Sequence, residues 1–201
     1  MSDEAAIKPF VPILIGTNRA ENLSGRAAEW LFAQMQMRAD LETELFDVSK
    51  YEFSSSDYGP TLRHQFADWS EAMGRADALV IVSPEYNHGY PGTLKCMLDV
   101  LRKEYIHKAV GLVGVSSGPW GGTRVIESLV PVVRELGLIV TFTDLHFPKI
   151  AAAADGTLAI DEPAHARRAT AFLDELIWMA AALRWGRKNL PSKFHPQTES
   201  L

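Results

Sequence analysis

The sequence predicts an α/β domain in which five parallel strands form one sheet and helices cover both of its faces. Short apolar runs alternate with longer amphipathic segments along the chain, the pattern of strands connected by helices. Residues 77–84 (DALVIVSP) form a continuous apolar run, typical of a strand covered on both sides. With 201 residues, 47% of them hydrophobic and 22% charged, the chain has the size and composition of one globular domain.

The first half of the chain contains three expected strands and two expected helices. Residues 10–16 (FVPILIG) are apolar and β-rich, and residues 23–39 repeat apolar side chains at helical spacing. Residues 41–49 alternate like a strand near a sheet edge. Residues 61–76 have one apolar helical face, and the apolar run 77–84 follows.

The second half repeats the pattern twice. A helix begins at about Pro91, because proline suits the first helical position. Residues 109–117 (AVGLVGVSS) form the fourth strand, and residues 120–137 form a helix. Residues 138–150 form the fifth strand and residues 163–188 the last helix.

Strands that alternate with helices pair in parallel through right-handed crossovers, which gives a three-layer sandwich. We expect residues 1–188 to form a single domain. Residues 189–201 contain two prolines and few apolar side chains, so we expect an extended or loosely attached tail.

Composition excludes several classes of protein. A net charge of −5 and a pI near 5.7 argue against nucleic-acid binding. The single cysteine, Cys96, excludes a disulfide framework or a cysteine-based zinc site within the chain. We expect a cytoplasmic protein without a signal peptide or membrane span, because the first nine residues are acidic and every apolar run is short.

A ligand should lie beyond the carboxyl ends of the strands, as in other open parallel sheets. The loop at residues 16–25 (GTNRAENLSG) matches neither the dinucleotide fingerprint nor the Walker loop. It combines small, hydroxyl, amide and cationic side chains at the start of a helix, where an anion binds well. These are Gly16, Thr17, Arg19, Asn22 and Ser24. They suit a terminal phosphate, although the polar side chains could instead simply cap the helix.

Two further loops should lie beside the first. The stretch at residues 84–92 (PEYNHGYPG) offers aromatic surface, and its glycines, Gly89 and Gly92, let a ring approach the main chain. A bulky β-branched residue in place of Gly89 should deform the loop if this position needs a positive φ. Residues 116–122 (SSGPWGG) form a second glycine-rich loop. Each loop alone could be a turn with packed aromatic residues. Together they predict a slot for a planar phosphorylated heterocycle, and FMN is the obvious candidate.

The stretch GTNR, followed later by SPEYNHGYPGTLKCMLD, resembles the NADPH-dependent FMN reductase family. That family has a flavodoxin-like fold and includes flavin, quinone, azo-dye and chromate reductases. The resemblance covers residues 10 to 150, and its second motif is highly specific. One departure is at Cys96 and Met97, where family members usually have Asn-Ala.

The resemblance implies a role for each loop. The first loop would hold the FMN phosphate, the second would carry the isoalloxazine ring, and the third would border the flavin from the other side. The implied cofactor-binding residues are Gly16, Thr17, Arg19, Asn22, Ser24, Pro84, Glu85, Tyr86, Asn87, Ser116, Ser117 and Gly118.

The expected function is an FMN-dependent oxidoreductase that takes hydride from NADPH or NADH and passes it to quinones, flavins or related acceptors. The chemistry belongs to the flavin, so we assign no catalytic side chain. His88 is expected to be solvated and Glu85 to order its loop, while Arg124 could meet a dinucleotide phosphate or form an ion pair. The histidines lack ligand spacing, so we predict no metal site.

Two other functions stay open from the residues alone: a flavodoxin-like electron carrier, and a non-enzymatic flavin-binding interaction module. The first loop lacks the T-x-T-G-x-T pattern of such carriers. Four tryptophans fall on expected helical faces and predict core or subunit contacts: Trp30, Trp69, Trp178 and Trp185. Because open flavin sites gain walls from a neighbouring subunit, we expect a homodimer or homotetramer.

Overall fold

The computed structural model describes residues 8–54, 56–151, 158–160 and 162–195. Its sheet contains six strands, all paired in parallel, in the order β2-β1-β3-β4-β5 with β6 also paired to β4. The strands are β1 (Ile13–Ile15), β2 (Leu45–Asp47), β3 (Ala78–Pro84), β4 (Lys108–Val115), β5 (Leu138–Val140) and β6 (Leu145–Phe147). This architecture confirms the predicted three-layer α/β fold.

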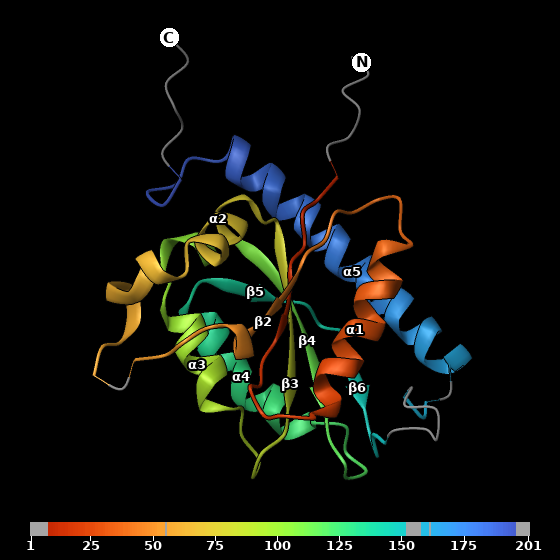
Figure 1. The fold of residues 1–201 in the computed structure, drawn as a ribbon. Coiled ribbons are helices and arrows are strands. Elements are labelled where there is room, and N and C mark those ends of the chain that lie inside the picture. The colour runs from red at the N-terminus through yellow and green to blue at the C-terminus, as the bar shows by residue number, and fades with distance from the viewer. Residues whose placement is uncertain (1–7, 55, 152–157, 161, 196–201) are drawn as a thin grey trace.

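In the described residues, five α-helices cover the sheet (Figure 1). They are α1 (Leu23–Gln36), α2 (Ala67–Arg75), α3 (Gly92–Asp99), α4 (Thr123–Glu135) and α5 (Glu162–Asn189). Helices α1 and α5 pack on one face, and α2, α3 and α4 pack on the other. In the part of the chain that the structure describes, no helix is long and apolar enough to cross a membrane.

The central strand β3 explains how one sheet supports two cores. All seven of its residues are buried. Leu79 and Ile81 point into the core beneath α2, α3 and α4, whereas Val80 and Val82 point into the core beneath α1 and α5. This alternation is the two-residue period of a strand covered on both faces.

The fifth predicted strand is divided, which the sequence did not indicate. Leu138–Val140 pairs with the start of β4, and Leu145–Phe147 pairs with its end. Between them, the Thr141 N–H donates to the Val110 carbonyl at 3.1 Å before the chain leaves the sheet. The apolar run 138–150 therefore forms β5 and β6 instead of one strand.

The expected helix at 61–76 is also divided. Residues Gly59–Gln65 form 3₁₀ turns, and α2 begins only at Ala67. Phe66 separates the two with a non-helical backbone (φ −124°, ψ 43°), and its buried ring stacks on Tyr51 at 5.1 Å. Burial of this aromatic side chain therefore overrides continuous helical periodicity.

An ion cluster fixes α5 to the amino ends of the strands. Buried Asp77 accepts hydrogen bonds from Arg184 and from Arg187, and its carboxylate also receives the Phe10 N–H at 3.1 Å. Three segments distant in sequence are therefore held at one point, opposite to the ends of the strands where a ligand was expected.

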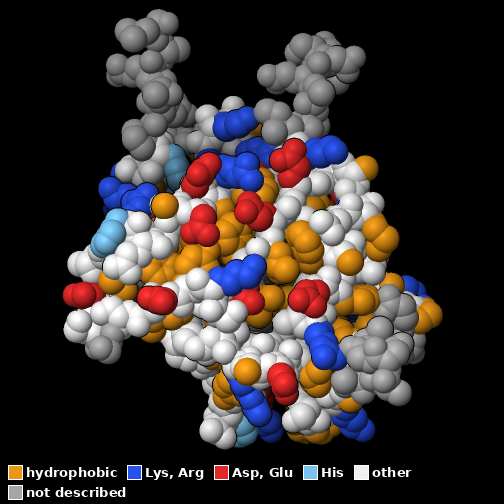
Figure 2. Space-filling view, in the orientation of Figure 1, with side chains coloured by type: hydrophobic (Ala, Val, Ile, Leu, Met, Phe, Trp, Pro, Cys, Tyr) orange, Lys and Arg blue, Asp and Glu red, His pale blue; other side chains and the backbone are white. Residues whose placement is uncertain are grey.

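The described part of the tail lies against the same end. His195 approaches the Ile106 carbonyl at 3.3 Å, and its ring lies 5.3 Å from that of His107. Phe194 also contacts the ring of His107, at 5.9 Å, while residues 196–201 of the expected tail lie outside the described residues. On the face drawn in Figure 2, acidic and basic side chains are interspersed.

Candidate functional site

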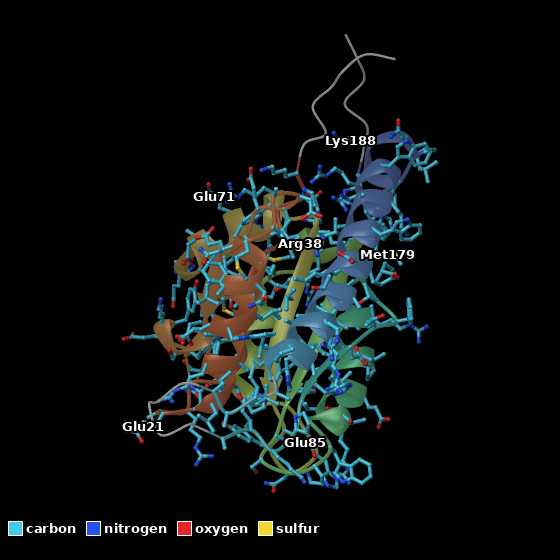
Figure 3. All side chains as sticks on the ribbon, turned by 90° about the vertical axis from the view of Figure 1, so that its right-hand side faces the viewer. Glu21, Arg38, Glu71, Glu85, Met179 and Lys188 are labelled. Atoms are coloured by element: carbon cyan, nitrogen blue, oxygen red, sulfur yellow. The ribbon has the colours of Figure 1, made fainter. Side chains whose placement is uncertain are left out.

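The three predicted loops meet at the carboxyl ends of β1, β3 and β4. Strand register aligns these ends, because Ile15 pairs with Val82, and Pro84 pairs with Val115. Glu21, in the loop after β1, and Glu85, in the loop after β3, both lie at this end of the molecule (Figure 3). The order β2-β1-β3 means that the chain reverses its direction of travel between β1 and β3, where ligands bind in such sheets.

The first loop is tightly packed where it leaves β1. A Cβ atom on Gly16 would lie 2.9 Å from Leu94 and 3.0 Å from the Val82 carbonyl, so a side chain cannot fit without movement. Thr17 is almost completely buried (1% exposed), and its hydroxyl accepts the Arg19 N–H at 3.3 Å. The loop therefore holds a buried hydroxyl group beside an exposed arginine.

Asn22 is the N-cap of α1. Its side-chain oxygen accepts the Gly25 N–H at 2.6 Å, and its amide nitrogen donates to the Arg19 carbonyl at 2.8 Å. Capping, which the sequence left open as an alternative, is therefore what the Asn22 side chain does here. Ser24 is buried in the first turn. The positive end of α1 and the Arg19 guanidinium remain suitable for an anion.

The second loop is a tight turn that reverses the chain between Tyr86 and Gly89. These two residues exchange backbone hydrogen bonds of 2.9 and 3.0 Å. Asn87 (φ 51°) and His88 (φ 71°) are both left-handed, which is the signature of a type I′ turn. Gly89 itself does not have a positive φ, so the condition for a strained substitution there is not met; the left-handed residues are the two before it.

Tyr86 joins the second loop to the first. Its hydroxyl shares a hydrogen bond of 3.1 Å with the Thr17 hydroxyl. A weaker contact of 3.5 Å joins Thr93, in the first turn of α3, to the Asn18 side chain. The expected phosphate loop and the expected ring-binding loop are thus connected through side chains.

Glu85 joins the second loop to the start of α4. Its carboxylate accepts the backbone N–H of Arg124 and contacts the Arg124 guanidinium, both at 3.3 Å. These contacts are consistent with a Glu85 that orders its loop, and they favour the ion-pair role of Arg124 that the sequence left open. Arg124 also lies over the ring of exposed Trp120, at 5.8 Å.

Glycines let the third loop fold closely over the end of β4. A Cβ atom on Gly114 would lie 2.5 Å from the Gly121 carbonyl, and Gly121 and Gly122 both have positive φ. The Ser116 hydroxyl donates to the Gly118 carbonyl at 3.0 Å, so it supports the loop itself. A Cβ atom on Gly118 would meet nothing within 4 Å, and Ser117 is exposed. A side chain at position 118 would therefore point into open space.

The segment after β6 is a neighbour of the site that the sequence analysis missed. The Lys149 N–H donates to the Gly118 carbonyl at 2.8 Å, and the Ile150 N–H donates to the Ser116 carbonyl at 3.0 Å. Lys149 is exposed and has a positive φ of 50°. The sequence analysis did not identify this segment (FPKI, residues 147–150) as part of the site, because it assigned these residues to the end of the fifth strand.

The residues present fit a phosphorylated planar cofactor. One end of the site offers a helix N-terminus, a hydroxyl group and the exposed Arg19, which suit a phosphate. The turn at Tyr86 and the open loop at Gly118 lie on neighbouring strands and would border a flat ring. His88 is exposed, as expected, and Cys96 is half-buried on α3. Among the described residues, no group of three or more histidine, cysteine or acidic side chains could hold a metal ion.

Asp144 lies between β5 and β6 and is partly buried. Asp144, just before β6, has a buried Oδ1 atom with no hydrogen bond. Desolvation raises the pKa of this carboxyl, and nearby His146 opposes the rise. His146 itself contacts the Gly121 carbonyl at 3.1 Å and so supports the loop.

The chain is similar to known flavin-dependent reductases in sequence and in fold. The chain is 28% identical over 174 residues to an FMN-dependent NADPH-azoreductase of Staphylococcus haemolyticus, a match that covers 82% of this chain and 92% of the relative. In fold it is similar to FerB, a flavoenzyme NAD(P)H:(acceptor) oxidoreductase of Paracoccus denitrificans, with a TM-score of 0.68, 20% identity and coverage of 84% of this chain and 97% of FerB. An NADH:FMN oxidoreductase (EMOB) has a TM-score of 0.61 and 18% identity, with coverage of 94% and 95%.

The family comparison covers the whole site. The model of the NADPH-dependent FMN reductase family matches residues 10–152, which include β1 to β6 and all three loops. The resemblance seen in the GTNR and SPEYNHGYPG motifs is thereby confirmed. The chain belongs to the NADPH-dependent FMN reductase family, a family of NAD(P)H-dependent flavoprotein oxidoreductases with a flavodoxin-like fold.

Proposed function

We propose that this protein reduces small electron acceptors such as quinones, flavins and azo compounds with electrons from NADPH or NADH. When bound, FMN would supply the hydride and electron transfer between the nicotinamide and the acceptor. The observation that supports this most strongly is the connection of the three loops by Thr17–Tyr86 and Glu85–Arg124. These contacts pre-organise one site from three separate strands.

In this proposal the side chains bind and orient. Arg19, the Thr17 hydroxyl and the N-terminus of α1 hold the phosphate, with Gly16 allowing close packing, Asn22 shaping the loop and Ser24 in the first turn. The segment from Pro84 to Asn87 supports the ring. Ser116, Ser117 and Gly118 border it from the other side. No side chain needs to act as an acid or base.

The acceptor class is supported by the staphylococcal relative, whose name specifies azo compounds. The test is steady-state oxidation of NADPH and of NADH by the FMN-loaded protein with a quinone, an azo dye or free flavin as acceptor. We expect turnover with at least one acceptor. Bound FMN without turnover would indicate an electron carrier and contradict the proposal.

We also propose that the chain acts as a single cytoplasmic domain with a short tail after residue 188, and that it assembles as a homodimer or homotetramer. Two large exposed tryptophans on α5, Trp178 and Trp185, support self-association. A measurement of the protein's mass in solution tests whether it self-associates.

A further inference from the structure

A cavity of about 750 Å³ lies at the amino ends of β4 and β5. Its lining includes Ile106 and His107, just before β4, together with Phe194 from the segment after α5. Because the strands are parallel, this end of the sheet is opposite to the three loops of the candidate site. Figure 3 likewise shows Lys188, near the end of α5, and Glu85 at opposite ends of the molecule. The cavity is therefore separate from the proposed flavin site, and the tail supplies part of its wall.

Residues 192–195, which we call the tail latch, dock beside this cavity through few contacts. The His195 ring contacts the Ile106 carbonyl at 3.3 Å. It also lies 5.3 Å from the ring of His107, which in turn meets Phe194 edge-on at 5.9 Å. Phe194 remains 47% exposed. A segment held by so few contacts can be released by a small change in free energy.

Cationic groups surround the docked His195 ring. His107 and Lys108 come from the start of β4, and Arg187 comes from α5. Arg187 is fixed in this position, because its guanidinium donates to the His107 carbonyl and to Asp77, both at 2.7 Å. A proton on the His195 ring would therefore be repelled from two separate elements of the fold.

The nearby carboxylates do not balance this charge. Asp99 and Glu135 line the same cavity, but in the described part of the chain neither forms an ion pair with a histidine. Asp99 instead binds Lys95 at 2.5 Å, and Asp77 already binds two arginines. The charged groups around the tail latch are thus Asp99, Arg102 and Glu135 in the cavity lining, His107, Lys108 and Arg187 around the imidazole, and Lys193 within the latch.

We propose that the tail latch is a pH-sensitive closure of this cavity, docked while His195 is neutral and released when its ring takes up a proton. Desolvation lowers the pKa of docked His195 below its ordinary value of 6.5, and the three cationic groups add to this effect, although the bond to Ile106 opposes it. The released latch therefore binds a proton more readily than the docked latch. Docking is favoured above pH 6.5 and is lost as the pH falls below that value. Release removes the Phe194 wall and opens the cavity.

Trypsin tests docking directly, because one of its cleavage sites, after Lys193, lies inside the tail latch. The FMN-loaded full chain is digested at about pH 7.5 and at about pH 5.5, on either side of the ordinary histidine pKa. A synthetic peptide of residues 189–201 corrects for the pH dependence of trypsin itself. We expect cleavage after Lys193 to be several-fold slower in the protein than in the peptide at the higher pH, and this protection to be lost at the lower pH.

His195→Gln is the matched control, because its amide can still donate to the Ile106 carbonyl but does not titrate. This variant should keep its protection at both pH values. Protection of the wild type that does not change with pH, or the same loss of protection in His195→Gln, would overturn the inference. Circular dichroism confirms that both proteins are folded at the lower pH.

Nuclear magnetic resonance locates the proton independently of the protease. The ring resonance of His195, identified by its absence in His195→Gln, should titrate below 6.5 in the wild type. In Phe194→Ala, which removes the contact with His107, its pKa should move back towards 6.5. A His195 titration that is the same in both proteins would overturn the inference. Neither measurement involves electron transfer, so either result leaves the proposed function unaffected.

Discussion

The hydroxyl groups of Thr17 and Tyr86 lie 3.1 Å apart and share a hydrogen bond, although 69 positions separate the two residues in the sequence. Thr17 follows β1, and Tyr86 follows β3. The contact joins the loop with phosphate-binding chemistry to the turn that would border the flavin ring. Since Thr17 is almost fully buried, the bond also satisfies a polar group that water cannot reach easily.

Tyr86→Phe should therefore weaken FMN binding without unfolding the protein. Loss of one neutral hydrogen bond costs about 0.5–1.5 kcal/mol. Titration of FMN by fluorescence quenching measures the effect, and a double-mutant cycle with Thr17→Val isolates the pair. Additive effects of the two substitutions would show that the contact does not couple the loops.

Arg19→Ala should weaken FMN binding by about 1.5–3 kcal/mol, because a charge-assisted bond to the phosphate is lost. Riboflavin, which lacks the phosphate, is the matched ligand and should bind equally to both proteins. An equal loss for FMN and riboflavin would place Arg19 away from the phosphate.

The turn at residues 86–89 gives a pair of substitutions with opposite outcomes. Gly89→Ala should be tolerated, because its Cβ atom would meet only the Tyr86 carbonyl, at an ordinary 3.8 Å. Asn87→Val should lower the free energy of unfolding by about 1–2 kcal/mol or more, since a β-branched residue opposes φ of 51°. Urea denaturation measures the free energy of unfolding of both variants. A larger loss for Gly89→Ala than for Asn87→Val would refute the type I′ assignment.

Asp77→Asn should destabilise the fold by about 3–5 kcal/mol, because the half-buried Arg184 and Arg187 would lose the buried carboxylate that both of them bind. Glu44→Gln is the control: its pair with Arg75 spans 3.6 Å between exposed side chains, so the loss should be below about 1 kcal/mol. Thermal or urea unfolding measures the loss of stability in both variants. Equal losses would show that the Asp77 cluster stabilises the fold no more than a surface ion pair does.

Lys108 should make stability depend on pH. Its ammonium group is buried against the Met73 and Gly74 carbonyls, and desolvation lowers its pKa from 10.5 to about 8. Between these values the unfolded chain binds more protons than the folded chain. The contribution of Lys108 to the free energy of unfolding therefore rises from pH 8 towards 10.5 and is lost as the pH falls through 8. The stability of wild type relative to Lys108→Met should rise over this window, and a constant difference would contradict the shift.

The sequence predicted those features that depend on local pattern. Apolar periodicity gave the order of strands and helices, and the rule for parallel sheets then placed the loops after β1, β3 and β4 at one edge. The apolar run at 138–150 was misread because its division depends on pairing with β4, a long-range interaction. Phe66 likewise leaves the helical pattern to stack on Tyr51.

The contacts within the site likewise could not be predicted from local sequence pattern. The amide of Asn22 fits both phosphate binding and capping by residue type, and only geometry assigns it to the cap. The left-handed conformation falls on Asn87 and His88 although a glycine is next in sequence, because the bonds between Tyr86 and Gly89 fix the turn. The Lys149 backbone bonds to Gly118 in the third loop because β6, just before it, pairs with the end of β4.

The central claim is that the loops after β1, β3 and β4 together bind an FMN that NADPH reduces. The most direct measurement is the absorption spectrum of the protein with FMN, followed by anaerobic addition of NADPH and then of a quinone. We predict a bound-flavin spectrum that bleaches with NADPH and recovers with the quinone. A protein that leaves FMN free in solution, or bound FMN that NADPH does not bleach, would contradict the account.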